Sequence, residues 1–161
     1  MNPTLNQLAC QNFGALCTLA KFLESRGYWT ANRAIELDVA SAVHQLFEAL
    51  AWADGNLHAR ECWLIDALLE GEASFHAELR ECFATGSSQA TLPGCIAAAA
   101  LHDSIHHTSL ADIFLNHLEN LGRLIVMADA TITPEELSTF HAHFAKLRHA
   151  IAPSECHASS V

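Results

Sequence analysis

The chain has 161 residues, 51% of them apolar, which is enough for one domain that buries about two-thirds of the surface of its unfolded chain. Its 18 acidic residues against 8 basic ones give a net charge of -10 at pH 7, which argues against nucleic acid as a partner because phosphate backbones need a cationic surface. The longest apolar run, "CIAAAAL" from Cys95 to Leu101, is far shorter than the roughly 20 residues that cross a bilayer, so we expect a soluble domain without a transmembrane segment.

The first half of the chain predicts four helices. Asn2 and Pro3 form a good N-cap and first-turn pair, so the first helix is expected to start there and to end at "SRG", residues 25–27. Three further groups of apolar residues recur at the spacing of one helix face. They lie at residues 35–50, 63–68 and 75–83.

The second half of the chain predicts three more helices. The sequence "TGSSQATLPG", residues 85–94, is expected to be a loop. The alanine-rich segment from Ile96 to Leu101 after it is expected to be a buried helix. Two longer apolar stripes follow, at residues 110–125 and 137–151.

These segments together predict an all-α fold. No segment alternates apolar and polar residues with the period of two that a half-buried strand would show. We therefore expect a compact bundle of about seven helices. Residues 1–150 would form it as a single domain, and residues 151–161 would be a flexible tail.

Two stretches of the chain repeat each other. "LFEALAWADGNLHARE", Leu46 to Glu61, aligns without a gap with "LGRLIVMADATITPEE", Leu121 to Glu136, and both contain A-D-x-x-[LI]-x-x-x-E. A pattern of this length occurring twice in a short chain indicates an internal duplication. We expect the two halves to be related by a pseudo-twofold arrangement.

Each copy places an aspartate at the end of one helix and a glutamate in the first turn of the next. The acidic residues are Asp54 and Glu61 in the first copy and Asp129 and Glu136 in the second. A buried aliphatic residue, Leu57 or Ile132, is expected to pin the turn between them. An exposed aspartate at a helix C-terminus faces the negative end of the helix dipole, which costs up to about 1 kcal/mol, so something is expected to compensate.

A shared cation would supply that compensation. If the two copies pack face to face, their four carboxylates converge and would repel one another or retain a proton. A bound hard cation removes the conflict, and ligands that are all oxygens suit Ca²⁺, Mg²⁺ or Mn²⁺. The sequence therefore predicts a divalent cation site at Asp54, Glu61, Asp129 and Glu136.

A purely structural interpretation competes with this site. "TPEE" is a capping box in which Thr133 is the N-cap, Pro134 the first helical residue, and Glu136 reaches back to the Thr133 backbone. The matching position in the first copy is His58, which is a poor cap. The chain could then be a metal-free helical scaffold for protein interactions.

The repeated motif resembles a known family. "WADGNLHARE" and its second copy, at the junctions of a helical bundle, resemble the tellurite-resistance TerB family and the related N-terminal domain of the DnaJ-like membrane co-chaperone, over residues 5–150. The second copy departs from the family pattern because Ala130 stands where glycine is usual. The resemblance implies a helical module whose paired acidic loops bind a divalent metal. It also implies protein interactions in stress-response or membrane-associated complexes, and no enzymatic reaction.

An enzymatic alternative rests on "LHDSIHH". His102 and Asp103 form the dipeptide of HD-type metal-dependent phosphohydrolases, which are all-helical and need a further upstream His and downstream Asp. His76 and Asp129 are the candidates for those two ligands. The few lysines and arginines disfavour this alternative, because phosphate substrates need cationic partners.

The 11 histidines carry little further signal. His117 lies within the stripe at residues 110–125 and is expected to be a hydrogen-bonded core histidine. The others are expected to be mostly solvated. His102 and His106 stand one helical turn apart, a spacing that by itself predicts only adventitious metal binding.

The cysteines indicate a reducing compartment. They are Cys10, Cys17, Cys62, Cys82, Cys95 and Cys156. They lie far apart without a CxxC pair, and the chain does not open with the pattern of a secretory signal. We interpret them as reduced thiols, mostly in the core, of a cytoplasmic protein.

Overall fold

The structure is a computed structural model, and it describes residues 4–51, 53, 92–128 and 131–152. Its helices are α1 (Leu5–Ser25), α2 (Ile35–Ala51), α5 (Gly94–His106), α6 (Leu110–Ala128) and α7 (Pro134–Ile151). The described residues contain no strand, so the predicted all-α class is confirmed. Of the roughly seven predicted helices, the structure describes five. The two expected at residues 63–68 and 75–83 lie outside the described residues, and the internal repeat stays a prediction.

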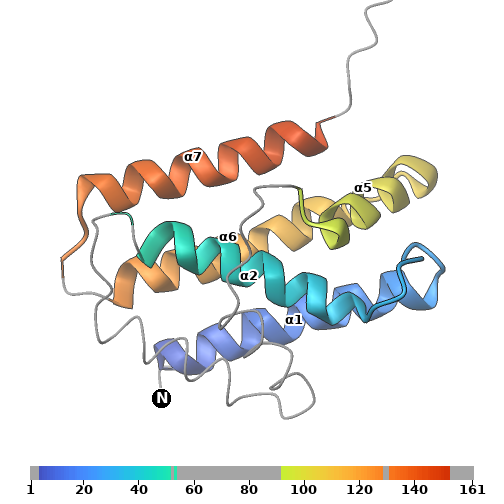
Figure 1. The fold of residues 1–161 in the computed structure, drawn as a ribbon, viewed down its shortest axis with the longest axis horizontal. Coiled ribbons are helices and arrows are strands. Elements are labelled where there is room, and N and C mark those ends of the chain that lie inside the picture. Colours follow the sequence, from blue (N-terminus) through green and yellow to red (C-terminus); the bar gives the residue numbers. More distant parts are fainter. Residues whose placement is uncertain (1–3, 52, 54–91, 129–130, 153–161) are drawn as a thin grey trace, which may run out of the picture.

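The helices form a layered bundle (Figure 1). The helices α2 and α6 each pack against all four of the other described helices, and α5 packs beside them. The helices α1 and α7 lie on opposite sides of this central group (Figure 1). The core is made by large apolar side chains that are fully buried. They include Phe13, Phe47, Phe114, Leu46, Leu115 and Ile96.

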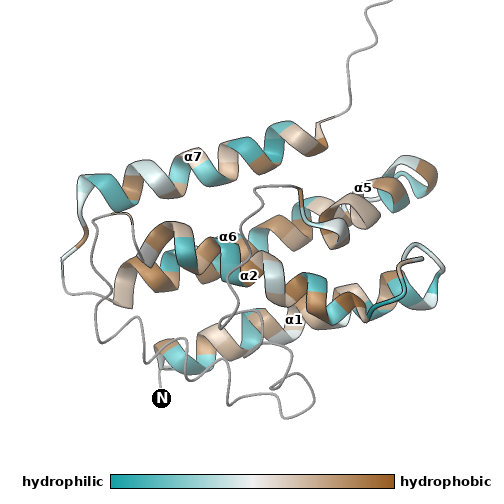
Figure 2. Ribbon diagram, viewed as in Figure 1, coloured by the Kyte–Doolittle hydropathy of each residue, from teal (hydrophilic) through white to brown (hydrophobic). Residues whose placement is uncertain are grey.

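The helix α7 is the most polar of the five. Figure 2 shows more hydrophilic colour along α7 than along α2 and α6. Its buried residues include Phe140 and Phe144, whose rings lie 5.0 Å apart. They pack over Gly122 of α6, where an added Cβ would come within 2.9 Å of the Phe140 ring. The absence of a side chain at Gly122 therefore sets how closely α7 can approach α6.

The start of α1 differs from the predicted one. The N-cap is Thr4 and the helix begins at Leu5, whereas the sequence favoured Asn2 and Pro3. Thr4 and Gln7 form a capping box: the Gln7 backbone N–H donates to Thr4 Oγ1 (3.3 Å), and the Thr4 N–H donates to Gln7 Oε1 (2.9 Å). This reciprocal pair satisfies two N–H groups, which explains why the helix starts here.

The end of α1 lies where "SRG" predicts it. The helix ends at Ser25, and Gly27 has a φ of +81°. The Gly27 N–H donates to the Glu24 carbonyl, and the Tyr28 N–H donates to the Leu23 carbonyl, at 3.0 Å each. These two bonds form a Schellman motif, which favours glycine because of the positive φ. The motif also fixes the position of Tyr28.

The helix α5 is longer than expected, because it continues past Leu101 to His106. Its start is held by a remote carboxylate: Asp38 of α2 is buried and accepts a hydrogen bond from the Cys95 N–H (2.7 Å). The same carboxylate pairs with Arg33 at 2.8 Å. A carboxylate near the first N–H groups of a helix is favourable, so Asp38 supplies the cap that Pro93 cannot.

Several apolar residues of the predicted stripes are exposed. The stripe on α6 is largely confirmed, since Leu121, Leu124 and Ile125 are buried. Ile113 on α6 and Leu101 on α5 are exposed instead. The final stripe extends to Ile151, the last residue of α7, which is half-buried against the core.

Candidate functional site

The predicted cation site lies only in part within the described residues. Asp54, Glu61 and Asp129 lie outside them. Glu136 is the only one of the four acids that the structure describes, and it occupies the first turn of α7 as predicted. The structure therefore tests the local role of Glu136 and the positions of the neighbouring helix ends.

Glu136 caps the helix that contains it. Its Oε2 accepts hydrogen bonds from the Thr133 N–H (2.7 Å) and from Thr133 Oγ1 (3.0 Å), and its own N–H donates to Thr133 Oγ1 (3.2 Å). The predicted capping box is confirmed. Glu136 is only 2% exposed, yet its Oε1 accepts no hydrogen bond from the described residues. The cap thus accounts for one of its two carboxylate oxygens.

The helix ends that precede the two acidic motifs lie at the same end of the bundle. The helix α2 ends at Ala51, shortly before Asp54, and α6 ends at Ala128, directly before Asp129. Figure 1 shows the C-terminal ends of α2 and α6 together with the start of α7 on its left-hand side. The helix α2 packs against both α6 and α7. We call this region the acidic-turn end of the bundle.

The side chain of Ile132 is not buried beneath the second acidic turn. It was expected to be buried, but it is 47% exposed, so this prediction is wrong. Ile132 directly precedes the N-cap Thr133, and Leu137, also exposed, is the fourth residue of α7. These are the two positions at which apolar residues commonly pack across a helix start, which explains an aliphatic residue that faces solvent here.

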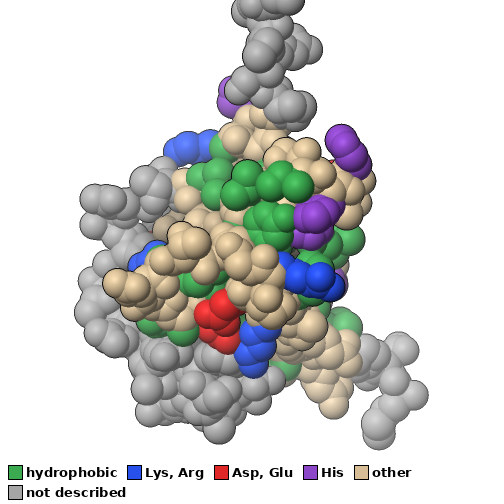
Figure 3. All heavy atoms as spheres, turned by 90° about the vertical axis from the view of Figure 1, so that its right-hand side faces the viewer, with side chains coloured by type: hydrophobic (Ala, Val, Ile, Leu, Met, Phe, Trp, Pro, Cys, Tyr) green, Lys and Arg blue, Asp and Glu red, His purple; other side chains and the backbone are tan. Residues whose placement is uncertain are grey.

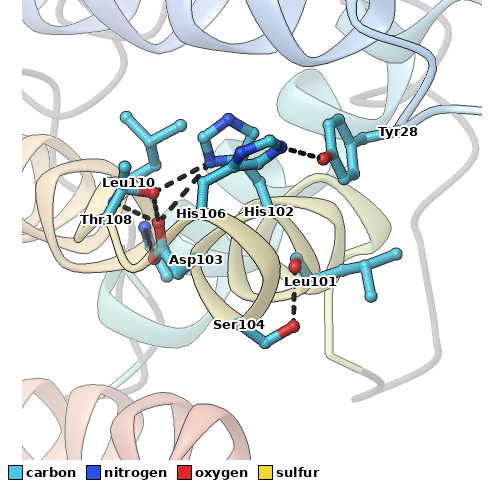
Figure 4. A network of polar contacts seen from close by, with 9 residues as sticks. Tyr28, Leu101, His102, Asp103, Ser104, His106, Thr108 and Leu110 are labelled. Atoms are coloured by element: carbon cyan, nitrogen blue, oxygen red, sulfur yellow. Dashed lines mark hydrogen bonds and ion pairs between the residues drawn. The ribbon is translucent and has the colours of Figure 1, made fainter.

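At the opposite end of the bundle, Asp103 caps α6. Its Oδ1 accepts hydrogen bonds from the Leu110 N–H (2.8 Å) and from Thr108 Oγ1 (2.5 Å), and its Oδ2 accepts one from the Ala111 N–H (2.8 Å). Figure 4 shows these contacts around Asp103. Burial opposes ionisation, but the hydrogen bonds outweigh it and hold the pKa of the Asp103 carboxyl below its usual value.

A left-handed residue brings the chain back to this cap. His107 follows the last residue of α5 with a φ of 55° and a ψ of 43°, and it is the only described non-glycine residue with positive φ. This conformation costs a bulky residue about 1 kcal/mol or more. It reverses the chain so that Thr108 and the first N–H groups of α6 reach Asp103. Sequence reasoning missed this cap, because histidine is not a usual signal for a left-handed turn.

The hydrogen bonds around Asp103 also fix the tautomer of His102. Nδ1 of His102 lies 2.9 Å from Thr108 Oγ1. The single hydroxyl hydrogen of Thr108 is donated to Asp103, so Nδ1 must be the donor to Thr108. Neutral His102 therefore carries its proton on Nδ1 and a lone pair on Nε2. His102 is 7% exposed, so the expectation that it is solvated is wrong.

Tyr28 and His106 complete an aromatic cluster around His102. The Tyr28 hydroxyl is hydrogen-bonded to Nε2 of His106 at 2.5 Å, and the rings of His102 and His106 lie 4.5 Å apart (Figure 4). The Tyr28 and Phe22 rings meet His102 edge-on at 5.0 and 5.7 Å. We call Tyr28, His102 and His106 the histidine cluster.

The geometry of Asp103 does not favour the phosphohydrolase alternative. Both of its oxygens already accept hydrogen bonds from the turn and from α6, three in all, so a metal at Asp103 would compete with the contacts that cap the helix. His76 and Asp129, the other expected ligands, lie outside the described residues, so the alternative stays a prediction. Within residues 4–51, 92–128 and 131–152, no three His, Cys, Asp or Glu side chains gather in an arrangement that could hold a metal ion.

Other predicted residues have structural roles. His117 is half-buried and its Nδ1 lies 3.0 Å from Asn12 Oδ1, which confirms a hydrogen-bonded histidine between α6 and α1. Cys17 and Cys95 are buried, as expected of core residues. Burial and the nearby Asp38 raise the pKa of the Cys95 thiol well above its usual value, so this thiol stays protonated.

A cavity of 540 Å³ opens between the end of α5, the start of α6 and the end of α7. Its lining includes Ala100, Ile151, Asp112 and Arg148. The Arg148 guanidinium donates to Glu119 Oε2 at 2.7 Å. The positive charge beside this cavity is therefore already balanced within the protein.

Comparison with known proteins adds no family. No protein-family model, curated protein or solved structure matches the chain. Among the described helices, none combines the length and the apolar character that crossing a membrane requires.

Proposed function

We propose that this chain is a non-catalytic, TerB-like helical module that binds one divalent cation, Ca²⁺, Mg²⁺ or Mn²⁺, at its acidic-turn end. The observation that carries the proposal is the common direction of α2 and α6, whose C-terminal ends lie at the same end of the bundle as the start of α7 (Figure 1). Each of these two helices leads directly into one copy of the acidic motif. Asp54, Glu61, Asp129 and Glu136 are the proposed ligands.

The local geometry of Glu136 supports a ligand role beside its cap. Glu136 lies in the first turn of α7 and is 2% exposed, and its Oε2 is occupied by the capping box. Its Oε1 accepts no hydrogen bond from the described residues, so this oxygen is available to a ligand. A cation at Oε1 would satisfy the second oxygen and leave the capping box intact.

The same end of the bundle offers a surface for a protein partner. Met127, Ile132 and Leu137 are large apolar residues, all exposed, that lie before and after the second acidic turn. A cation that joins the two turns would fix this surface relative to α2. We propose that the loaded module presents it to a partner in a stress-response or membrane-associated complex, as the TerB resemblance implies.

Thermal unfolding tests the cation site. We expect the melting temperature to rise by roughly 5–10 °C when Ca²⁺, Mg²⁺ or Mn²⁺ is added after chelation to about 100 times its Kd, because a ligand that binds only the folded state stabilises it. The double variant Asp54→Asn, Glu61→Gln should lose this rise. The matched control Glu24→Gln, Asp112→Asn removes two exposed acids elsewhere and should keep it.

Other outcomes separate the alternatives. An equal rise in the wild type and the Asp54→Asn, Glu61→Gln variant would place any cation elsewhere and contradict the proposed ligands. No rise with any of the three cations would leave a metal-free interaction scaffold. Turnover of a nucleotide or phosphodiester that is lost in His102→Ala would contradict the non-catalytic assignment.

A further inference from the structure

We propose that the histidine cluster is a second metal site, which takes one borderline divalent transition-metal ion of the Zn²⁺, Ni²⁺ and Cu²⁺ class between His102 and His106. This site is separate from the acidic turns. The cluster lies where α1 and α5 end, and the acidic-turn end lies at the opposite side of the bundle in Figure 1. The chemistry of the two sites also differs, because imidazole nitrogens select borderline metals and carboxylates select hard ones.

The first step in the argument is the fixed tautomer of His102. The chain of hydrogen bonds from Nδ1 through Thr108 Oγ1 to Asp103 holds the proton of neutral His102 on Nδ1. Nε2 then presents a lone pair that takes no hydrogen bond from the described residues. Histidines that bind metals are commonly held in this way, with the other ring nitrogen donating to an acceptor backed by a carboxylate.

The second step is the position of the partner ring. His106 lies one helical turn after His102, and the two rings are 4.5 Å apart with a tilt of 35°. His106 is exposed, so an ion can reach the cluster from solvent. Figure 3 looks at this end of the bundle and shows histidine side chains at the surface among hydrophobic ones.

The third step concerns the oxygen donor beside His106. Tyr28 is placed by the Schellman motif at the end of α1, and its hydroxyl is hydrogen-bonded to Nε2 of His106. A bound ion takes the place of this hydrogen bond at His106, and the Tyr28 hydroxyl turns toward the ion or its water. The two imidazole nitrogens leave the other coordination positions to water, so the bound ion stays exchangeable with solvent.

Neighbouring groups favour nitrogen ligands without a carboxylate. Both oxygens of Asp103 accept hydrogen bonds that hold the turn and cap α6, and we assign Asp103 the role of orienting His102 through Thr108. The edges of the Phe22 and Tyr28 rings against His102 restrict its motion. The ring that provides the buried ligand is thus already held in place before an ion arrives.

Calorimetric titration with Ni²⁺ tests the site on the full chain. We expect one Ni²⁺ per chain, lost in the double variant His102→Gln, His106→Gln. The control His141→Gln, His149→Gln changes two exposed histidines of α7 and should bind as the wild type does. Equal binding by the first variant and the wild type would overturn the proposal.

Two variants of Thr108 test the positioning of His102 without changing a ligand. Thr108→Val removes the acceptor for Nδ1 and should weaken Ni²⁺ binding by about tenfold or more, whereas Thr108→Ser keeps the hydroxyl and should bind as the wild type does. Circular dichroism checks that both variants are folded. If a folded Thr108→Val variant bound Ni²⁺ as tightly as the wild type, the binding would be adventitious and the proposal would fail.

The single tyrosine of the chain gives an independent readout. Paramagnetic Ni²⁺ bound at the cluster should broaden the Tyr28 ring signals in the NMR spectrum at one equivalent. The broadening should persist in Asp54→Asn, Glu61→Gln, because the acidic turns play no part in it. Sharp Tyr28 signals at one bound equivalent of Ni²⁺ would place the ion elsewhere and contradict the proposal.

Discussion

The two ends of the bundle each hold a carboxylate beside the start of a helix, and the two carboxylates differ in how their oxygens are used. Asp103 accepts three hydrogen bonds with both oxygens and caps α6. Glu136 caps α7 with Oε2 alone, while its Oε1 accepts none from the described residues. Asp103 therefore has little acceptor capacity left beyond its cap, whereas Oε1 of Glu136 remains available to a ligand.

The same difference determines which metal each end could take. At the acidic-turn end the proposed donors are carboxylate oxygens, which suit Ca²⁺, Mg²⁺ or Mn²⁺. At the other end Asp103 is occupied, and the atom left with a lone pair is Nε2 of His102. The two sites therefore differ in the donor atoms that remain available: a carboxylate oxygen at one end and an imidazole nitrogen at the other.

The largest effect is expected from removing the fully used carboxylate. Asp103→Ala leaves two N–H groups of α6 and the Thr108 hydroxyl without their acceptor, which should cost about 3 kcal/mol of unfolding free energy. Urea unfolding measures this loss. The matched control Asp112→Asn, an exposed acid in the first turn of α6, should change stability by less than about 1 kcal/mol. Equal losses in the two variants would show that Asp103 is not the cap.

A smaller effect is expected where α7 packs on α6. Gly122→Ala places a Cβ within 2.9 Å of the Phe140 ring and should destabilise the fold by about 1–3 kcal/mol. Gly14 on α1 has no atom within 4 Å of an added Cβ, so Gly14→Ala should stabilise by up to about 1 kcal/mol through helix propensity. Thermal melts of the two variants measure the contrast, and shifts of the same sign would contradict the packing described for Gly122.

The smallest effect is expected from pH. Burial lowers the pKa of His44 below its ordinary value of 6.5, although Glu48 acts in the opposite direction. As the pH falls, His44 takes up a proton in the unfolded chain before it does so in the folded one. The contribution of neutral His44 to the free energy of unfolding is therefore complete above pH 6.5 and is lost as the pH falls toward the lower folded-state pKa. His143 has a pKa lowered by burial and by Lys146 and adds a loss of the same sign. Urea unfolding across this range should show a shallower pH dependence for His44→Gln, and an unchanged slope would contradict the assignment.

The sequence predicted the helices better than their ends. Apolar periodicity located all five described helices. The sequence "SRG" located the end of α1, because the positive φ that ends the helix there favours a glycine, Gly27. Thr4 replaced Asn2 as the N-cap, because two good capping residues lie close together and only the pair with Gln7 decides between them. Helix α5 continued to His106 through a polar segment in which no apolar stripe marks its end.

The sequence predicted local contacts of the sites and missed the tertiary ones. The capping box of Thr133 and Glu136 is a short-range pattern and could be predicted from its spacing. The cap by Asp103 depends on a left-handed His107, and the orientation of His102 depends on Thr108 returning to α5. The Asp103 cap and the contact between His102 and Thr108 follow no repeated sequence pattern, so neither contact could be predicted from residue spacing. Ile132 was misjudged because an aliphatic residue between two helices can pack across a helix start as well as into a core.

The most direct test of the proposed cation site is NMR with one equivalent of Mn²⁺ on the full chain. A paramagnetic ion held between the two acidic turns should broaden the amide signals of Leu50, Ala128 and Thr133 together, because Leu50 lies in the last turn of α2, Ala128 ends α6 and Thr133 directly precedes α7. The ring signals of Tyr28, at the opposite end of the bundle, should stay sharp. Broadening at only one of the three amides, or equal broadening of Tyr28, would contradict a cation shared by the two turns.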